Sequence, residues 1–185
     1  MKVVGIQSSP NVDGLTSKLA QATLQGAESE GIETELIHLN KFKIESCKAH
    51  GRGWGTCRKE GKCMIKDDFQ EIREKIEEAD ALVFSTPVYF GDISESAKRF
   101  LDRWRRCERE NMTRSDAPLK EKIVIGITAA GGSGGGAVNA LRNLERYLRH
   151  LQLTIFDLVP VTQKSKHHKL TMLKTAGKRL VTYEK

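Results

Sequence analysis

Short apolar runs alternate with amphipathic stretches along most of the chain. The apolar runs predict buried strands at residues 2–7, 32–39, 81–85, 123–128 and 154–159. Apolar positions spaced three or four residues apart predict helices at residues 15–27, 69–79, 97–104 and 138–151. Residues 40–67 follow neither period. Strands and helices therefore alternate, with one irregular segment after the second strand.

This alternation is typical of an α/β domain in which helices cover both faces of a parallel sheet. Because crossover connections between parallel strands are right-handed, the topology is restricted to doubly wound forms. Five strands suit the flavodoxin-like order 2-1-3-4-5. Ligands of such sheets bind beyond the carboxyl ends of the strands. The loops that follow the strands are therefore where a functional site is expected.

The loop after the first strand, residues 8–17, is rich in small hydroxyl residues and leads directly into a helix. Free backbone N–H groups and the positive end of the helix dipole create an anion site there. Ser9, Thr16 and Ser17 can add hydroxyl donors, and the loop contains no lysine or arginine. An ordinary N-capped helix start is the simpler interpretation, but it does not explain so long a loop of this composition. Neither GxGxxG nor GxxxxGK[ST] is present.

Two further loops lie at the same edge of the predicted sheet. Residues 86–92 hold Tyr89 and Phe90 between a proline and a glycine, which suits covering a planar ring or anchoring a turn in the core. Residues 129–136 are mostly glycine, which allows a close backbone approach or a flexible connection. Strands 1, 3 and 4 are neighbours in the predicted order. The three loops together therefore suit a ligand with a phosphate at one end and a flat ring at the other.

The three loops resemble those of the flavodoxin-like NAD(P)H-dependent FMN reductase family over roughly residues 1–159. The resemblance implies FMN as the cofactor and NAD(P)H as the co-substrate. It places the FMN phosphate in the first loop and the isoalloxazine ring at the aromatic turn, beside the glycine loop. The residues that it implies for FMN binding are Ser9, Asn11, Gly14, Leu15, Thr16, Ser17, Pro87, Val88, Tyr89, Phe90, Gly91, Gly131 and Gly132.

The first loop departs from the family pattern at three positions. The family usually has Gly where Ser8 stands, a basic residue near Asn11, and Asn where Leu15 stands. The last difference weakens a side-chain contact with the cofactor. The backbone cradle does not depend on any of the three.

Four cysteines are present, and three of them fall within seventeen residues. In a chain without an export signal this clustering favours a metal, cluster or redox role over disulfides. The run that ends in residues 63–68 resembles the iron–sulfur flavoprotein branch of the family. That branch has four cysteines, and here the second position is a histidine, so the implied ligands are Cys47, His50, Cys57 and Cys63. An iron–sulfur cluster, a tetrahedral zinc and a site of redox-active thiols all remain open. Cys107 is expected in the core.

The composition is that of an ordinary soluble domain, with 38% hydrophobic and 30% charged residues and a net charge of +7. Seven lysines and arginines but one acidic residue lie in residues 161–185. The chain is therefore divided into one FMN-binding domain, residues 1–160, and a basic C-terminal tail, residues 161–185. The tail is interpreted as a solvated segment, with an anion-attracting arm as the alternative, and no nucleic-acid-binding face is predicted. No apolar run suggests a membrane span or a secretory signal, so a cytoplasmic location is expected.

The leading functional hypothesis is an FMN-dependent oxidoreductase that passes electrons from NAD(P)H to a small flavin or quinone acceptor. The alternatives are an iron–sulfur electron carrier that serves a redox protein, and a non-catalytic module rigidified by zinc. Since the flavin supplies the chemistry, no side-chain acid or base is assigned. Four groups are expected simply at the surface: Asp92, Arg103, His167 and His168. A homo-oligomer, most simply a dimer, is expected because a flavin at a sheet edge is exposed on one side.

Overall fold

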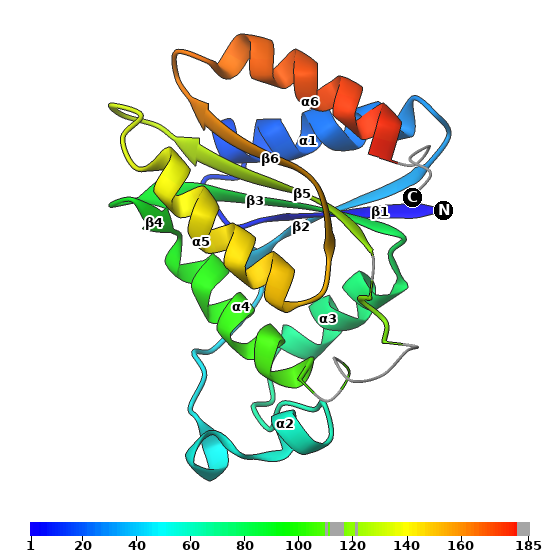
Figure 1. The fold of residues 1–185 in the computed structure, drawn as a ribbon, viewed down its shortest axis with the longest axis vertical. Helices are drawn as coiled ribbons and strands as arrows, with labels where there is room; N and C mark the ends of the chain where they lie inside the picture. Colours follow the sequence, from blue (N-terminus) through cyan, green and yellow to red (C-terminus); the bar gives the residue numbers. More distant parts are fainter. Residues whose placement is uncertain (110, 112–116, 121, 181–185) are drawn as a thin grey trace.

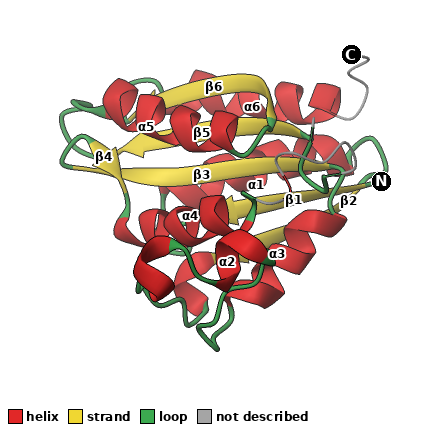
Figure 2. Ribbon diagram, turned by 60° about the horizontal axis from the view of Figure 1, so that its bottom comes forward, coloured by secondary structure: helices red, strands yellow, loops and turns green. Residues whose placement is uncertain are grey.

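A parallel sheet lies at the centre of the computed structural model, which describes residues 1–109, 111, 117–120 and 122–180. Within these residues five strands run parallel in the order β2-β1-β3-β5-β6 (Figure 2). Their bounds are β1 (Lys2–Gln7), β2 (Glu33–His38), β3 (Ala81–Tyr89), β5 (Ile123–Ala130) and β6 (Thr154–Thr162). The predicted order of the five parallel strands is confirmed.

The aromatic turn is part of a hairpin that the sequence pattern did not predict. β3 was expected to end at residue 85, but it continues to Tyr89 and pairs antiparallel with a short strand, β4 (Asp92–Ile93). The two connecting residues, Phe90 and Gly91, have φ angles of 50° and 80°. Two-residue hairpin loops of type I′ require positive φ at both central positions, which suits glycine and strains phenylalanine. A two-residue strand is too short to show any alternation in sequence.

Helices cover both faces of the sheet (Figure 1). On one face lie α1 (Leu15–Glu28) and α6 (Lys166–Leu180); on the other lie α3 (Phe69–Glu78), α4 (Glu95–Cys107) and α5 (Ala137–His150). Each face has its own apolar core, with Leu19 and Leu173 in the first and Phe100 and Leu144 in the second. Among the helices that the structure describes, none is long and apolar enough to cross a membrane.

The C-terminal helix corrects the interpretation of the basic segment. Leu173, Ala176 and Leu180 of α6 are buried in the same core as α1, and the two helices lie side by side in Figure 1. The expectation of a solvated segment is therefore wrong for residues 166–180. The lysine-rich composition concealed these three apolar positions, whose helical spacing lets α6 bury one face and expose its charges.

Two glycines allow α1 and α6 to cross at very short range. A Cβ atom at Gly177 would lie 1.9 Å from the carbonyl oxygen of Thr23, and one at Gly26 would lie 2.0 Å from that of Lys174. Any larger residue at either position would collide with backbone rather than with a movable side chain. The close approach of the two helices thus depends on the absence of both side chains.

Residues 40–67, called here the cysteine segment, connect β2 to α3 with little regular structure. They contain the end of a 3-10 turn at Leu39–Lys41, another turn at His50–Gly53 and the short helix α2 (Thr56–Lys59). Figure 1 shows α2 beyond the ends of α3 and α4, away from the sheet. The segment is therefore attached to the domain chiefly through its contacts with α4.

Candidate functional site

The start of α1 is open to an anion. Gly14 is the N-cap residue in an extended conformation, and no side chain of a described residue caps the helix. This helix also carries no acidic residue in its first turn. The N–H groups and the positive dipole end of a helix attract an anion when nothing else satisfies them. The geometry therefore has the features expected of the predicted phosphate site.

Two hydroxyl groups stand at this helix start. The Oγ atom of Ser17 is buried and has no hydrogen-bond partner among the described residues. Thr16 is also buried, with 4% of its surface exposed. An unpartnered buried hydroxyl costs about 1–3 kcal/mol, which a phosphate oxygen would recover by forming a hydrogen bond. These residues therefore fit the phosphate of FMN.

The other loop residues predicted for FMN binding shape the loop. Ser9 Oγ accepts a hydrogen bond from the Asn11 amide at 3.2 Å, and Asn11 Oδ1 accepts one from the Asp13 amide at 3.3 Å. The Leu15 side chain packs against the core beneath α1. Ser9 and Asn11 therefore order the backbone, and Leu15 is an anchor of the helix.

A buried hydroxyl network holds this loop against β3 and α4. Ser94 Oγ donates to Ser8 Oγ at 2.8 Å, and Ser85 Oγ donates to the Thr16 carbonyl oxygen at 2.9 Å. Asn40 Nδ2 donates to the Ser8 carbonyl oxygen at 2.8 Å. The network explains why serine is accommodated at position 8. Sequence reasoning missed Ser94 and Asn40, because their partners lie on distant parts of the chain.

The aromatic turn and the glycine loop enclose a cavity of about 410 Å³, lined by Val88, Phe90, Gly91 and residues 130–136. The two loops touch through glycines, since a Cβ at Gly136 would lie 2.5 Å from the Gly91 Cα. A Cβ at Gly131 or Gly132 would meet nothing within 4 Å, so both face open space. Of the residues predicted for the flavin ring, Val88, Phe90, Gly91, Gly131 and Gly132 line this cavity, whereas Pro87 and Tyr89 do not.

The two aromatic side chains of the turn are free to contact a ligand. Phe90 is fully exposed, and Tyr89 has 47% of its surface exposed. Pro87 lies in the sheet, paired in register with Ala129 of β5, and so fixes the start of the turn. Large exposed aromatics beside a cavity mark a binding surface more often than a core contact.

The four predicted metal ligands line one small pocket in the cysteine segment. Cys47, His50, Cys57 and Cys63 share it with Met64 and Arg106. In the described part of the chain, no group of three or more His, Cys, Asp or Glu residues is placed to hold a metal ion. The structure therefore gathers the expected ligands without forming a metal centre.

Arg103 is the main residue that sequence reasoning misjudged. It was expected at the surface, yet its side chain is 1% exposed. Its Nη1 and Nη2 atoms lie 2.6 Å and 2.9 Å from the two carboxylate oxygens of Asp67, whose side chain is also buried. Nη2 further donates to Cys63 Sγ at 3.3 Å. Asp92 is half-buried, whereas His167 and His168 are exposed as expected.

Arg103 belongs to a row of arginines that holds the cysteine segment against α4. Arg99, Arg103 and Arg106 donate to the carbonyl oxygens of Ile44, Glu45 and Gly53 at 3.5, 3.1 and 3.2 Å, respectively. Residues spaced by four and three positions share one face of a helix. That spacing was visible in the sequence and is the signal that could have identified this face.

The surroundings of Cys63 favour its thiolate. A hydrogen bond with the Cys107 thiol, the Ile65 amide and Arg103 together lower the pKa of Cys63 to about 5, against the opposing effect of burial. The same hydrogen bond and burial raise the pKa of Cys107. Of the pair, Cys63 therefore favours the thiolate form and Cys107 the protonated form.

Cys63 of metal-free protein should be alkylated by iodoacetamide with a rate that rises around pH 5, because the thiolate is the reacting form. Mass spectrometry of peptides after short exposures at pH 4–8 would follow it, with Cys63→Ser confirming the assignment. Arg103→Gln should move the midpoint upward. A midpoint near the ordinary thiol pKa of about 8.5 would contradict the expectation.

Comparisons with known proteins agree with this geometry. A model of the NADPH-dependent FMN reductase family matches residues 1–161. An iron–sulfur flavoprotein of Methanocaldococcus jannaschii is 34% identical over 161 residues, which are 86% of this chain and 78% of that protein. An iron–sulfur flavoprotein of Methanosarcina thermophila is 30% identical over 158 residues, covering 85% of this chain and 78% of that protein.

A solved structure shows the same fold. The NAD(P)H:quinone oxidoreductase from Methanothermobacter marburgensis superimposes with a TM-score of 0.75, covering 100% of this chain and 99% of that chain at 19% identity. The extent of the family match and the identity to the relatives are decisive for classification. The chain belongs to the NADPH-dependent FMN reductase family and is a flavoprotein oxidoreductase with a flavodoxin-like fold.

Proposed function

We propose that this protein passes reducing equivalents from NAD(P)H through bound FMN to a small acceptor of the flavin or quinone type. The observation that carries the proposal is the unpartnered Ser17 hydroxyl at an uncapped helix start, at the same sheet edge as the aromatic and glycine loops. An anion site and a ring site at one edge suit FMN. Its flavin supplies the hydride and electron chemistry.

The residues of this chain bind and orient the cofactor. The first-turn amides of α1, with Thr16 and Ser17, hold the phosphate; Tyr89 and Phe90 cover the ring. Val88, Gly91, Gly131 and Gly132 line the remaining space, and the glycines leave room for a second planar molecule. One open cavity then serves donor and acceptor in turn, because no described side chain closes it.

The test is anaerobic mixing of FMN-loaded protein with NADPH and, separately, NADH, while the flavin absorbance is followed. Bleaching by at least one of them, and recovery when a quinone or free flavin is added, is the expected result. A flavin that neither dinucleotide reduces would overturn the proposal.

Ser17→Ala and Thr16→Ala should each weaken FMN binding by about 1–3 kcal/mol, the value of a hydrogen bond to a charged group. Thr16→Asp should be worse, because its carboxylate repels the phosphate dianion. Fluorescence titration of apoprotein measures all three. Ser29→Ala, at the other end of α1, is the matched control and should leave the affinity unchanged. If all variants bound FMN as tightly as wild type, the assignment of the phosphate to the start of α1 would be wrong.

A second candidate function is electron transfer through an iron–sulfur cluster. One observation favours it: Cys47, His50, Cys57 and Cys63 line a single pocket. We expect protein purified in air to keep FMN but little iron, since three thiolates and an imidazole hold a cluster less firmly than four thiolates. His50→Cys, reconstituted anaerobically, should then retain more iron. No gain in iron would leave the pocket as a site of reactive thiols.

We further propose a homodimer, because Phe90 and Tyr89 are exposed at the sheet edge and a partner subunit would shield them. Light scattering at micromolar concentration should give twice the chain mass of 20.7 kDa. A monomer mass would contradict it.

A further inference from the structure

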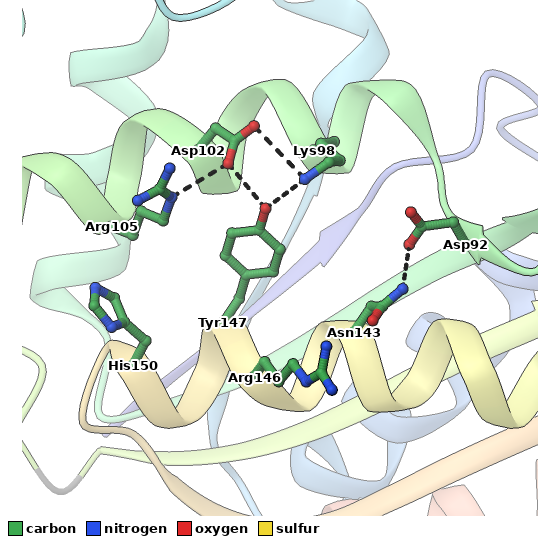
Figure 3. A pocket seen from close by; sticks show the side chains of 8 residues that line it. All are labelled: Asp92, Lys98, Asp102, Arg105, Asn143, Arg146, Tyr147 and His150. Carbon is green, nitrogen blue, oxygen red and sulfur yellow. Dashed lines mark hydrogen bonds and ion pairs between the residues drawn. The ribbon is translucent and has the colours of Figure 1, made fainter. Parts of the chain in front are cut away.

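A larger cavity, of about 630 Å³, lies between α4 and α5 and is lined by charged side chains (Figure 3). It is separate from the ring cavity but begins next to it. Asn143 Nδ2 donates to Asp92 Oδ1 at 2.9 Å at one end, and Asp92 directly follows Gly91, which lines the ring cavity. A molecule that reaches the flavin ring can therefore extend into this groove.

The carboxylate in the middle of the groove, Asp102, is paired with two cations. Tyr147 Oη donates to Asp102 Oδ1 at 2.8 Å and accepts from Lys98 Nζ at 2.6 Å. Arg105 Nε donates to the same carboxylate oxygen at 3.2 Å. Lys98 Nζ also lies 3.7 Å from Asp102 Oδ2. With two donors and this second cation around it, the Asp102 carboxylate does not repel an incoming anion.

The end of the groove away from Asp92 carries a guanidinium and an imidazole, both of which can donate hydrogen bonds. Arg105 uses Nε for Asp102, so both of its Nη groups remain available within the described part of the chain. Figure 3 shows Arg105 of α4 and His150 of α5 together at this end, and Arg146 nearer the middle. Among the residues that the structure describes, the side chains of His150 and Arg146 have no hydrogen-bond or ion-pair partner. Burial, together with the charges of Arg105 and Arg109, lowers the pKa of His150.

The dimensions suit an extended dinucleotide. Arg105 lies seven positions after Lys98, and His150 lies seven positions after Asn143, so each wall of the groove is about 10 Å long. Asp92 at the flavin end can accept hydrogen bonds from a carboxamide. The unpaired Arg146 guanidinium in the middle, and the two Nη groups of Arg105 at the far end, suit two successive phosphates.

Building on the proposed function, we propose that the α4–α5 groove binds NADPH, with Arg146 at its pyrophosphate and Arg105 and His150 at its adenosine 2′-phosphate. The groove then selects NADPH over NADH, because only NADPH carries an anion for Arg105. The two arginines make different contributions. Arg146 recognises a group that both dinucleotides share, and Arg105 recognises the one that distinguishes them.

Steady-state kinetics with both dinucleotides test this division. Arg105→Gln should raise KM for NADPH about tenfold or more, the cost of a charge-assisted contact, while KM for NADH and both kcat values stay within about twofold. Arg146→Gln should raise KM for both dinucleotides alike. Arg142→Gln, which removes the same charge from α5 outside the groove, is the control and should change neither.

A binding measurement makes the result independent of turnover. Calorimetric titration of FMN-loaded protein with adenosine 2′,5′-bisphosphate should show binding that Arg105→Gln weakens about tenfold, with adenosine 5′-monophosphate and inorganic phosphate binding far more weakly. Loss of all flavin reduction with this binding intact would overturn the proposed function alone. Flavin reduction by both dinucleotides, with a KM ratio that Arg105→Gln leaves unchanged, would overturn the groove assignment. Equal binding of phosphate and the bisphosphate would overturn it too.

Discussion

Replacing Arg103 with methionine is expected to lower the free energy of unfolding by about 3–5 kcal/mol. The change leaves the Asp67 carboxylate buried without its counter-ion. A buried unpaired charge lowers stability by far more than the intact ion pair adds to it. It also removes the hydrogen bonds to Glu45 and Cys63, so the cysteine segment loses its central attachment to α4. Urea unfolding monitored by circular dichroism measures the effect.

Arg149→Met is the matched control. Arg149 is exposed and pairs with the half-buried Glu145, so the substitution should lower the free energy of unfolding by less than about 1 kcal/mol. The dependence on pH provides a second readout. Burial raises the pKa of Asp67, but Arg103 and two backbone amides outweigh it and hold that pKa below its ordinary value. The contribution of the pair is therefore present above about pH 4 and is lost as pH falls through the folded-state pKa. The difference between wild type and Arg103→Met should narrow in acid; a constant small difference would contradict a buried pair.

Alanine at Gly177 is expected to lower the free energy of unfolding by about 3 kcal/mol, at the upper end for overpacking. The new Cβ would meet the Thr23 carbonyl oxygen at 1.9 Å, so α6 must shift away from α1. The sign of the change in the free energy of unfolding distinguishes the two cases, because replacing glycine with alanine inside an unhindered helix stabilises the protein by up to about 1 kcal/mol. Thermal and urea unfolding measure the loss.

Thr175→Ala, on the exposed side of α6, is the control and should change stability by less than about 0.5 kcal/mol. Gly26→Leu should cause a similar loss of stability, because its side chain, on α1, would collide with the Lys174 carbonyl oxygen of α6. A stabilising effect of alanine at Gly177 would mean that the two helices do not approach so closely.

The central fold was predictable because its signals are local. Each strand of the parallel sheet is a short apolar run, and each covering helix carries its own apolar stripe, so the period identifies both. The features on which the proposed phosphate site rests are equally local, since hydroxyl residues directly before a helix lie in one stretch of sequence.

The errors concern residues whose environment depends on a distant partner. Charged side chains are rarely buried unless paired, so Arg103 alone suggests the surface, and only Asp67, brought close by folding, changes that. The hairpin at Phe90 depends on a two-residue strand that has no pattern of its own. In α6 the many lysines suggested a solvated segment. The helical spacing of its few apolar residues, together with Gly177, in fact indicated a packed helix.

The crossing of α1 and α6 constrains substitution as well as packing. Gly26 lies inside the region that the family model matches, whereas Gly177 lies beyond it. Side chains that meet across a contact tend to covary among homologues. In a family member with a bulky residue at position 26, the helix equivalent to α6 should therefore lie further from α1 or be absent. The residue at position 26 thus indicates whether a helix outside the region matched by the family model packs against α1.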